Sequence, residues 1–521
     1  MDRSFHLLIG DSLTTTARRI PNRTAVVFRD ERVTYGEIEA GANQVAHAAL
    51  AHGLRRQDTV ALFVHNCPEF LELWFGLPKA GIIHTPVSHR WKGEEVAHQI
   101  IDSESKAVFA SAELVEALNP HLDHELSHIP REKFVILEGT PPPGMTAFED
   151  FIRGFPTTVP GAPVDENDVF CLRYTSGTTG RPKGSMITQR RQWLIYNFIA
   201  LEYGISEEDV TLIVAPLSHA AGAFSGGSVQ VGAKIVLSRE FNPEDVLRTI
   251  QEEKGTNIFM VPSMYGMILR LPEEVKSKYD LSSMRTVSSA ASPLPTRLKE
   301  EIIKFFPNAG LHEWYGSTEY GFVSNLRPPD QLRKVRCVGQ PKFGNQIRLL
   351  DGEKRDVPVG EPGDIYVRGP CIQLGYFKHP EADAEATVEG GWLCNGDVGR
   401  MDEEGYLYIV DRKADMIISG GYNVYPVEIE NVLMLNPKVQ EACVFGVPDE
   451  KWGEAVKAQV ILKPNEETTP EELIAFANQH LAGYKVPKSV DFVDDFPRLA
   501  TGKVLKREIR QSFWEGQEAT I

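Results

Sequence analysis

Patterns of buried strands alternate with patterns of amphipathic helices in the N-terminal part of the chain, and this alternation limits it to few folds. The apolar runs Thr59–Val64 and Gly81–Val87 have the length and composition of buried strands. Before and between them, Glu37–Ala51 and the segment that Pro68 opens carry apolar residues at helical spacing. Strands and helices that alternate at this spacing form βαβ units, so the sequence predicts an α/β protein with a mostly parallel sheet.

Composition narrows the classes of protein that remain. The chain has 521 residues, enough for two or more domains. Its net charge of −17 disfavours binding to nucleic acid or to an anionic membrane. The 6 cysteines form no CxxC pair, so we expect reduced thiols rather than disulfides or a zinc site. No apolar run reaches the roughly 18 residues of a membrane span. The N-terminus lacks a signal-peptide core, so we expect a cytoplasmic protein without an integral membrane segment.

A loop rich in glycine and hydroxyl groups runs from Tyr174 to Gly184, with the sequence YTSGTTGRPKG, after a strand pattern. Glycines let the backbone approach a ligand closely, and successive N–H groups in such a loop form a concavity that binds anions. The spacing differs from a Walker A loop, because Gly184 rather than Ser or Thr follows Lys183. The loop predicts a polyphosphate site. Its candidate contacts are Thr175, Ser176, Gly177, Thr178, Thr179, Gly180 and Lys183.

The same loop resembles the phosphate loop of the adenylate-forming superfamily, which includes acyl-CoA synthetases, aryl-CoA ligases, adenylation domains of peptide synthetases and beetle luciferases. Three further segments resemble the superfamily in the same order: Glu313–Glu319 (EWYGSTE), Gly391–Gly399 (GWLCNGDVG) and Asp411–Pro426. A fourth segment near the C-terminus, Pro497–Lys503 (PRLATGK), resembles the lysine loop of the superfamily, so the resemblance extends over nearly the whole chain, from about Val33 to Arg510.

The resemblance implies two domains of unequal size. Residues 1–411 form a large domain of βαβ-layered sheets plus a β-rich subdomain, to which we assign Gly363–Gly369 and Gly375–Tyr376. Residues 412–521 form a small, mobile α+β domain that carries the catalytic lysine. The usual hinge position, Asp or Lys in relatives, falls on Ala414. We expect Asn119–Asp165, rich in proline, glycine and charge, to be a surface excursion.

The nucleotide contacts follow from these motifs. Tyr315 offers a flat face to adenine, and the small residues after the strand Thr286–Ser289 leave room for a planar ring. Asp397 is suited to accept hydrogen bonds from the ribose hydroxyls, and Glu319 is a hard oxygen ligand for Mg²⁺ beside phosphate. Besides the phosphate loop, the resemblance assigns nucleotide contacts to Ala290, Ala291, Ser292, Glu313, Trp314, Tyr315, Gly316, Thr318, Asp397, Arg412 and Lys503.

Catalysis and thiol binding are assigned by the same resemblance. The catalytic residues are Lys503, Thr318, Glu319 and His219, with Glu319 as the metal ligand. Gly420 and Gly421 admit the pantetheine arm of CoA in relatives. His219, in PLSHAAG, lies where relatives border the acyl pocket and the thiol tunnel, and Ala221 leaves a roomier pocket floor. The acyl-pocket residues are Trp193, His219, Ala221, Phe224, Tyr265, Gly316 and Phe322.

These assignments predict an AMP-forming acid–CoA ligase. It activates a hydrophobic acid with ATP and Mg²⁺ to acyl-AMP and pyrophosphate, and then transfers the acyl group to CoA. The pocket residues do not choose among fatty, aryl and alicyclic acids. One alternative is an amino-acid or acyl adenylation enzyme that loads a separate carrier protein, although Ala220–Gly227 lacks the Asp that holds a substrate amine. Another is a nucleotide sensor without turnover. The oligomeric state stays open, a homodimer included.

Overall fold

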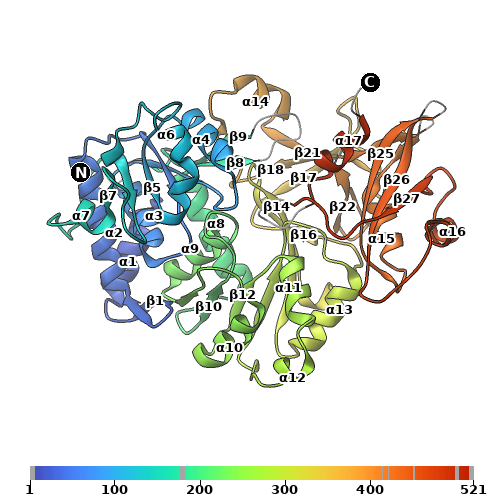
Figure 1. Ribbon diagram of the computed structural model, residues 1–521, viewed down its shortest axis with the longest axis horizontal. Coiled ribbons are helices and arrows are strands. Elements are labelled where there is room, and N and C mark those ends of the chain that lie inside the picture. The colour runs from blue at the N-terminus through green and yellow to red at the C-terminus, as the bar shows by residue number, and fades with distance from the viewer. Residues whose placement is uncertain are drawn as a thin grey trace.

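The computed structural model describes residues 6–175, 182–412, 415–419, 422–449, 452–498 and 504–514. It has a large N-terminal part built on two mixed sheets, a smaller β subdomain and a small C-terminal α+β part (Figure 1). This architecture confirms the predicted fold class. Among the described residues, no helix is long and apolar enough to cross a membrane.

The first sheet has 8 strands in the order β19-β9-β8-β4-β3-β5-β6-β7. Strands β3 to β8 pair in parallel, as the alternation of strands and helices predicts, and β9 and β19 add an antiparallel edge. The strands are β3 (Thr59–Phe63), β4 (Ile83–Pro86), β5 (Ser105–Ala110), β6 (Phe134–Ile136), β7 (Thr146–Ala147), β8 (Val169–Thr175), β9 (Lys183–Thr188) and β19 (Gly375–Tyr376).

The second sheet has 9 strands in the order β16-β15-β14-β13-β12-β10-β11-β1-β2. Its centre, from β1 to β14, is parallel, and the two edges are antiparallel. The strands are β1 (Thr24–Phe28), β2 (Glu31–Thr34), β10 (Val210–Ile213), β11 (Lys234–Leu237), β12 (Asn257–Phe259), β13 (Thr286–Ser289), β14 (Gly310–Ser317), β15 (Gly321–Leu326) and β16 (Gln340–Pro341).

Helices from the N-terminal half pack with both sheets into one large core. The helix α2 begins with a capping box between Thr34 and Glu37, and a Cβ at Gly76 of α3 would lie 2.4 Å from the Ala42 carbonyl oxygen, so this glycine lets α2 and α3 pack closely. The helices of this core are α1 (Ile9–Arg19), α2 (Tyr35–Ala51), α3 (Pro68–Lys79), α8 (Gln189–Tyr203) and α9 (Ala221–Val231). The other helices of the large part are α4 (Gly93–Asp102), α5 (Ala112–Val115), α6 (Asn119–Leu122), α7 (Phe148–Ile152), α10 (Pro243–Glu253), α11 (Pro262–Leu269), α12 (Glu273–Lys276), α13 (Thr296–Phe305) and α14 (Pro380–Ala386).

Two smaller sheets complete the fold. The β subdomain has 5 strands: β17 (Gln346–Leu350), β18 (Gly363–Arg368), β20 (Thr387–Val388), β21 (Trp392–Met401) and β22 (Leu407–Arg412). The C-terminal sheet also has 5 strands: β23 (Ile417–Ser419), β24 (Tyr422–Val424), β25 (Val439–Asp449), β26 (Gly453–Leu462) and β27 (Ser489–Phe492). The C-terminal helices are α15 (Pro426–Leu433), α16 (Pro470–His480) and α17 (Lys506–Trp514).

Two expectations about local structure are wrong. Asn119–Asp165 is not only a surface excursion, because the apolar residues Phe134–Ile136 form β6, which is buried and extends the first sheet. Gly375–Tyr376 does not belong to the β subdomain, because Gly375 pairs with Met186 of β9 in the first sheet. Both segments are too short for their pairing partner to be visible in the sequence.

Candidate active site

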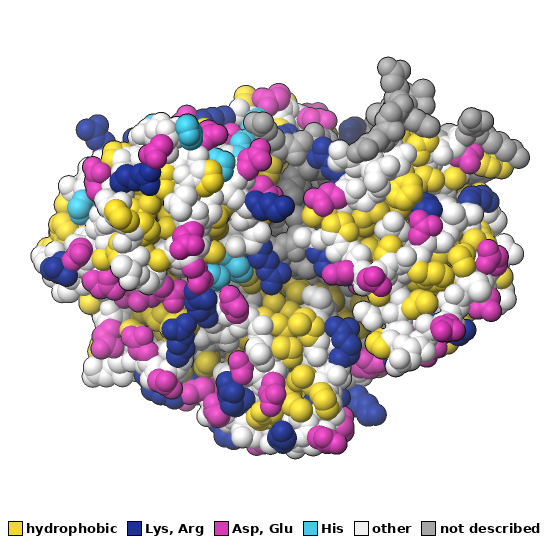
Figure 2. Space-filling model, in the orientation of Figure 1, with side chains coloured by type: hydrophobic (Ala, Val, Ile, Leu, Met, Phe, Trp, Pro, Cys, Tyr) yellow, Lys and Arg dark blue, Asp and Glu magenta, His cyan; other side chains and the backbone are white. Residues whose placement is uncertain are grey.

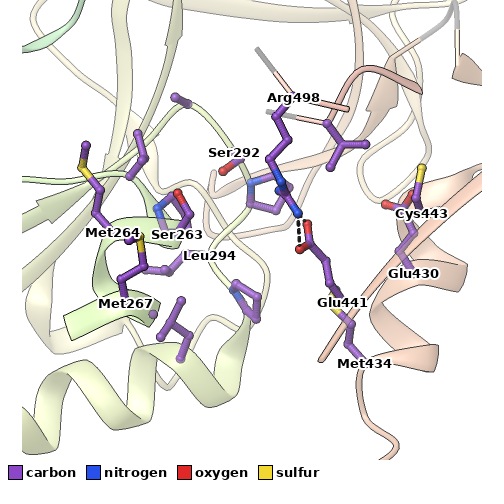
Figure 3. A pocket seen from close by; sticks show the side chains of 18 of the residues that line it. Ser263, Met264, Met267, Ser292, Leu294, Glu430, Met434, Glu441, Cys443 and Arg498 are labelled. Carbon is purple, nitrogen blue, oxygen red and sulfur yellow. Dashed lines mark hydrogen bonds and ion pairs between the residues drawn. The ribbon is translucent and has the colours of Figure 1, made fainter. Parts of the chain in front are cut away.

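A cleft of about 2700 Å³ lies between the large N-terminal part and the C-terminal part. The segments that follow β3, β10, β11, β12 and β13 line it, so it meets the carboxyl ends of the parallel strands, where open α/β sheets bind ligands. Figure 2 shows the cleft as a hollow with basic and histidine side chains along one wall. In Figure 3, Met264, Ser292 and Leu294 face Glu441 and Arg498 of the C-terminal part across it.

The cleft brings together residues from three separate motifs. The predicted nucleotide contacts that line it are Ala291, Ser292, Glu313, Trp314, Tyr315, Gly316 and Asp397. The hydroxyl of Tyr315, at the end of β14, donates a hydrogen bond to Oδ2 of Asp397 on β21, with a distance of 2.6 Å. An aromatic face and a carboxylate are therefore joined at one point of the cleft, as a site for a base and its ribose requires.

A sharp turn at Ala291 and a bulge at Gly316 shape the backbone around these residues. Ala291 has a φ of 74°, in the left-handed region, so the loop after β13 turns sharply beside the cleft. A Cβ at Gly316 would lie 2.0 Å from the carbonyl oxygen of Gly321, so only glycine fits at this bulge between β14 and β15. Ala290 is buried. The turn and the bulge place Ala291 and Gly316 along the same cleft.

Glu313 lines the cleft, but its carboxylate is held by the protein. It forms a buried ion pair with Lys299 of α13, and its Oε1 accepts a hydrogen bond from the Leu294 amide at 3.3 Å. Burial raises the pKa of Glu313, and Lys299 opposes that effect. The arrangement ties the loop Ala290–Leu294 to β14. A direct contact of this carboxylate with a nucleotide stays a prediction.

Glu319 and Lys183 are connected through a residue that sequence reasoning missed. Oε1 of Glu319 accepts a hydrogen bond from the Tyr376 hydroxyl at 3.0 Å, and Nζ of Lys183 lies 5.8 Å from the centroid of the Tyr376 ring. Nη2 of the buried Arg191 donates to the carbonyl oxygen of Thr318 at 2.5 Å. Burial raises the pKa of Tyr376, and Glu319 raises it further, so the tyrosine is a neutral donor. No motif surrounds Tyr376, and only the pairing of β19 with β9 brings it here.

His219 lies on the turn before α9. Burial, followed by the charge of Arg173, lowers its pKa to about 4, so the imidazole is neutral at pH 7. Its Nε2 is buried and has no hydrogen-bond partner among the described residues. His219 does not line the cleft, but its amide donates to the carbonyl oxygen of Pro216, which does.

Most of the predicted acyl-pocket residues belong to the large hydrophobic core or pack against it. Phe224 stacks on Phe259 with ring centroids 5.0 Å apart, and Phe322 stacks on Trp314 at the same separation. Tyr265 is buried and donates to the Ser288 carbonyl oxygen at 3.0 Å. Ala221 is buried, and Trp193 packs against the core. Of the seven predicted pocket residues, Gly316 alone lines the cleft itself.

Several predicted contacts lie outside the described residues: Ser176, Gly177, Thr178, Thr179, Gly180, Gly420, Gly421 and Lys503. For Thr175 and Arg412 the structure describes the backbone only. Described residues next to two of these segments line the cleft: Pro182 after the phosphate loop, and Arg498 and Val504, which pair on either side of the lysine loop. Arg412 is the strand partner of Asp397.

Comparison with known proteins agrees with this site. Residues 13–377 match the AMP-binding enzyme family, and residues 428–503 match the AMP-binding enzyme C-terminal domain. The chain is 35% identical to a feruloyl-CoA synthase from an Amycolatopsis species over 511 residues, covering 97% of this chain and 99% of the relative. It is 32% identical to the fatty acid–[acyl-carrier-protein] ligase ScoC of Streptomyces coeruleorubidus over 527 residues, 99% and 98% of the two chains.

A solved structure is similar over the same length. The crystal structure of the anthranilate CoA ligase AuaEII with anthranoyl-AMP aligns with a TM-score of 0.90 and 29% identity, covering 98% of each chain. The fold and the cleft thus define an enzyme that forms acyl adenylates. The chain belongs to the AMP-binding enzymes of the adenylate-forming superfamily, within the AMP-forming acyl- and aryl-CoA ligases.

Proposed function

We propose that this enzyme is an AMP-forming ligase that joins a hydrophobic carboxylic acid to CoA. The observation that carries the proposal is the cleft in which Tyr315 and Asp397 form a hydrogen bond. Arg498 and Val504 of the C-terminal part line the same cleft. ATP binds with adenine against Tyr315 and ribose at Asp397. Attack of the acid carboxylate on the α-phosphorus releases pyrophosphate and leaves acyl-AMP, and the CoA thiol then displaces AMP.

The first step joins two anions, so the site must supply positive charge and hydrogen-bond donors at the phosphates. We assign this role to the phosphate loop, Lys183 and Lys503. Glu319 fits a single Mg²⁺, because its carboxylate is oriented by Tyr376 and one protein carboxylate with phosphate oxygens is a common Mg²⁺ site. Bound there, the metal would neutralise charge on the phosphates. No protein nucleophile is needed.

An apolar acyl group suits the residues behind Gly316. The stacked rings of Trp314 and Phe322 and of Phe224 and Phe259 offer flat apolar surfaces to a chain or ring. The relatives include a feruloyl-CoA synthase, whose name gives an aromatic acid, and a fatty-acid ligase. We therefore keep both aryl and fatty acids as candidate substrates.

The thiol acceptor has two candidates. CoA is favoured by the CoA-ligase names of the feruloyl and anthranilate relatives. A carrier protein is the second candidate, because ScoC loads one according to its name. Both acceptors present the same pantetheine arm, so the adenylation step is common to them.

We place the domain boundary at residues 411–412, as the sequence predicts. Asp411, at the end of β22, accepts a hydrogen bond from the Val427 amide in the first turn of α15 at 3.0 Å. This contact supports a boundary here, because it joins the β subdomain to the C-terminal part. It also supplies a polar contact next to the hinge position, where the side chain of Ala414 cannot form one. Rotation about the hinge exchanges Lys503 for Gly420 and Gly421 at the acyl-phosphate.

A screen of several acids against two thiol acceptors tests the proposal. Purified enzyme is given ATP, Mg²⁺ and one acid from acetate, octanoate, palmitate, benzoate, cinnamate and ferulate, with either CoA or a holo acyl-carrier protein. Mass spectrometry then identifies the acylated thiol. We expect acyl-CoA from at least one hydrophobic acid. Exclusive acylation of the carrier protein would favour the second candidate, and no acid-dependent AMP would exclude both.

A further inference from the structure

A group of polar side chains with buried, unpartnered atoms lies around β8 and β9. Nε and Nη2 of Arg173, on β8, are buried and have no hydrogen-bond partner among the described residues. The guanidinium carbon lies 5.6 Å from the centroid of the Trp74 ring. Ser185 is the strand partner of Arg173 on β9, and its Oγ is likewise buried without a partner in the part of the chain that is described.

Three further side chains around Trp74 have unpartnered buried nitrogens. These are both ring nitrogens of His84, Nε2 of Gln192 and Nε2 of His219, counted over the described residues. The His84 ring centroid lies 4.5 Å from that of Trp74, and the Trp74 indole donates to Tyr196 on α8, the helix that carries Gln192. His219 belongs to the set because its amide carbonyl accepts from Gly222, where an added Cβ would lie 3.6 Å from the Trp74 ring, and because the charge of Arg173 acts on its imidazole. We call this set the Arg173 cluster: Arg173, His84, Ser185, Gln192, His219 and Trp74.

The charge of this cluster is unbalanced. No described carboxylate forms an ion pair with Arg173. Burial, with a smaller effect of Arg173, lowers the pKa of His84 to about 3 and that of His219 to about 4, so both are neutral at pH 7. Burial raises the pKa of the neighbouring Cys171 thiol to about 11, so it supplies no negative charge. Arg173 is half-buried, but two of its guanidinium nitrogens are fully buried without a partner or a counter-charge, which is unfavourable because nearly all buried polar groups in proteins have partners.

The missing partner is an acceptor. Arg173, Ser185 and Gln192 present N–H or O–H donors, which match a carboxylate or a carbonyl group. The cluster residues do not themselves line the cleft, but the turn Pro216–His219 connects it with the cluster. The reacting carboxylate must stay at the α-phosphate in the cleft. Any substrate group that reaches Arg173 is therefore at the opposite end of the acid.

We propose that the Arg173 cluster binds a second acceptor group at the far end of the acid substrate, beyond an apolar body. This inference rests on the proposed function and narrows its substrate class to acids with a distal carboxylate or carbonyl. The carboxylate is favoured, because it alone neutralises the guanidinium and pairs with it through two parallel hydrogen bonds.

Thermal unfolding without ATP tests the site independently of turnover. The probes are terephthalate, adipate and suberate, each with an apolar counterpart of similar shape: 4-methylbenzoate, heptanoate and nonanoate. We expect at least one dicarboxylate to raise the Tm of the wild type more than its counterpart. Arg173→Leu should unfold at the wild-type Tm or higher without acid, because an unbalanced charge is removed, and should lose the difference between the paired acids.

A matched control is Arg56→Leu, which removes an arginine that pairs with Asp168 at 2.5 Å. It should lower the Tm without changing the response to acids. A lower Tm of Arg173→Leu without acid, or a wild type that no dicarboxylate stabilises more than its counterpart, would overturn the proposal. In the first case Arg173 is a structural residue, and in the second the cluster binds water only.

Turnover gives the second readout. For the best dicarboxylate, Arg173→Leu should lower kcat/KM by about 10-fold or more, with Arg173→Lys in between. The value for the apolar counterpart should stay unchanged. An equal loss for both acids would contradict the proposal. If no acid supports pyrophosphate release, the proposed function fails, whereas the thermal shifts still decide whether Arg173 binds a carboxylate.

Discussion

The hydroxyl of Tyr376 donates a hydrogen bond to Oε1 of Glu319 at a distance of 3.0 Å. The two residues are far apart in the sequence and meet because β19 pairs with the edge of the first sheet. This bond fixes one oxygen of Glu319, and no described residue holds the other, which a ligand can therefore use. It links the carboxylate to the strand that begins with Lys183, whose ammonium lies 5.8 Å from the same tyrosine ring.

Removal of this hydroxyl tests the role of the pair. Tyr376→Phe should lower kcat of adenylation by about 10- to 100-fold and raise the Mg²⁺ concentration for half-maximal rate, because Glu319 loses its orienting donor. Initial rates across a Mg²⁺ titration measure both effects. Tyr279→Phe is the control, since Tyr279 donates to Glu244 at 2.9 Å and neither of these two residues lines the cleft. Equal rates for Tyr376→Phe and wild type would show that Glu319 needs no such support.

The contact between Tyr315 and Asp397 predicts how the enzyme recognises ribose. Asp397→Asn should raise KM for ATP by about 10-fold or more, because a charge-assisted hydrogen bond to a hydroxyl is lost. The variant should also lose much of the wild-type preference for ATP over 2′-deoxy-ATP. Comparison of kcat/KM for the two nucleotides measures this preference. A preference that the substitution leaves unchanged would place the ribose elsewhere.

The ion pair of Lys299 and Glu313 predicts a large effect on stability. Lys299→Met leaves a carboxylate buried without its partner and should lower the free energy of unfolding by about 3–5 kcal/mol. Urea denaturation measures the change. The matched control is Arg297→Ala on the same helix, whose exposed pair with Glu301 should contribute at most about 0.5 kcal/mol. Similar values for the two variants would mean that Glu313 is solvated or neutral in the folded protein.

Buried histidines predict a loss of stability in mild acid. Burial lowers the pKa of His84 to about 3 and that of His312 to about 4. The unfolded chain therefore binds protons below about pH 6.5 that the folded protein does not bind. Stability from these groups is complete above pH 6.5 and declines as the pH falls towards 4. Between pH 6.5 and pH 5, the contribution of each histidine to the free energy of unfolding should fall by up to about 2 kcal/mol.

Denaturation in urea at pH 7 and pH 5 checks this dependence. The free energy of unfolding of the wild type should be lower at pH 5 than at pH 7. In His84→Phe this decrease should be smaller by the contribution of His84, while the aromatic contact with Phe170 is retained. Equal stability of the wild type at both pH values would contradict neutral burial of these rings.

The sequence predicted the elements that repeat a pattern and missed those that depend on one tertiary contact. Apolar runs identified β3 and β4, and a compact motif placed Tyr315 in the cleft beside Asp397. The pairing of β19, by contrast, has two residues and no local signal, so Tyr376 was assigned to the wrong sheet. Lys299 lies on an amphipathic helix where lysine is usually exposed, and only the approach of β14 buries it.

The acyl pocket shows a further limit of sequence reasoning. The family resemblance selected Phe224 and Phe322, but a sequence does not say whether such rings line a cavity or fill it. In the structure each stacks on another ring. Arg173 illustrates the converse, because its position before the loop motif suggested no role until the burial of its nitrogens was visible.

Acid-dependent exchange of pyrophosphate into ATP by the wild type and Lys503→Ala tests the central claim most directly. The account predicts exchange with at least one acid of the panel, and a loss on the order of 100-fold in the variant, because one well-placed charge is removed from the transition state. The variant should still convert presynthesised acyl-adenylate to acyl-CoA at a rate close to that of the wild type. Absence of exchange with every acid, or exchange that survives loss of Lys503, would contradict an adenylate-forming cleft completed by the C-terminal part.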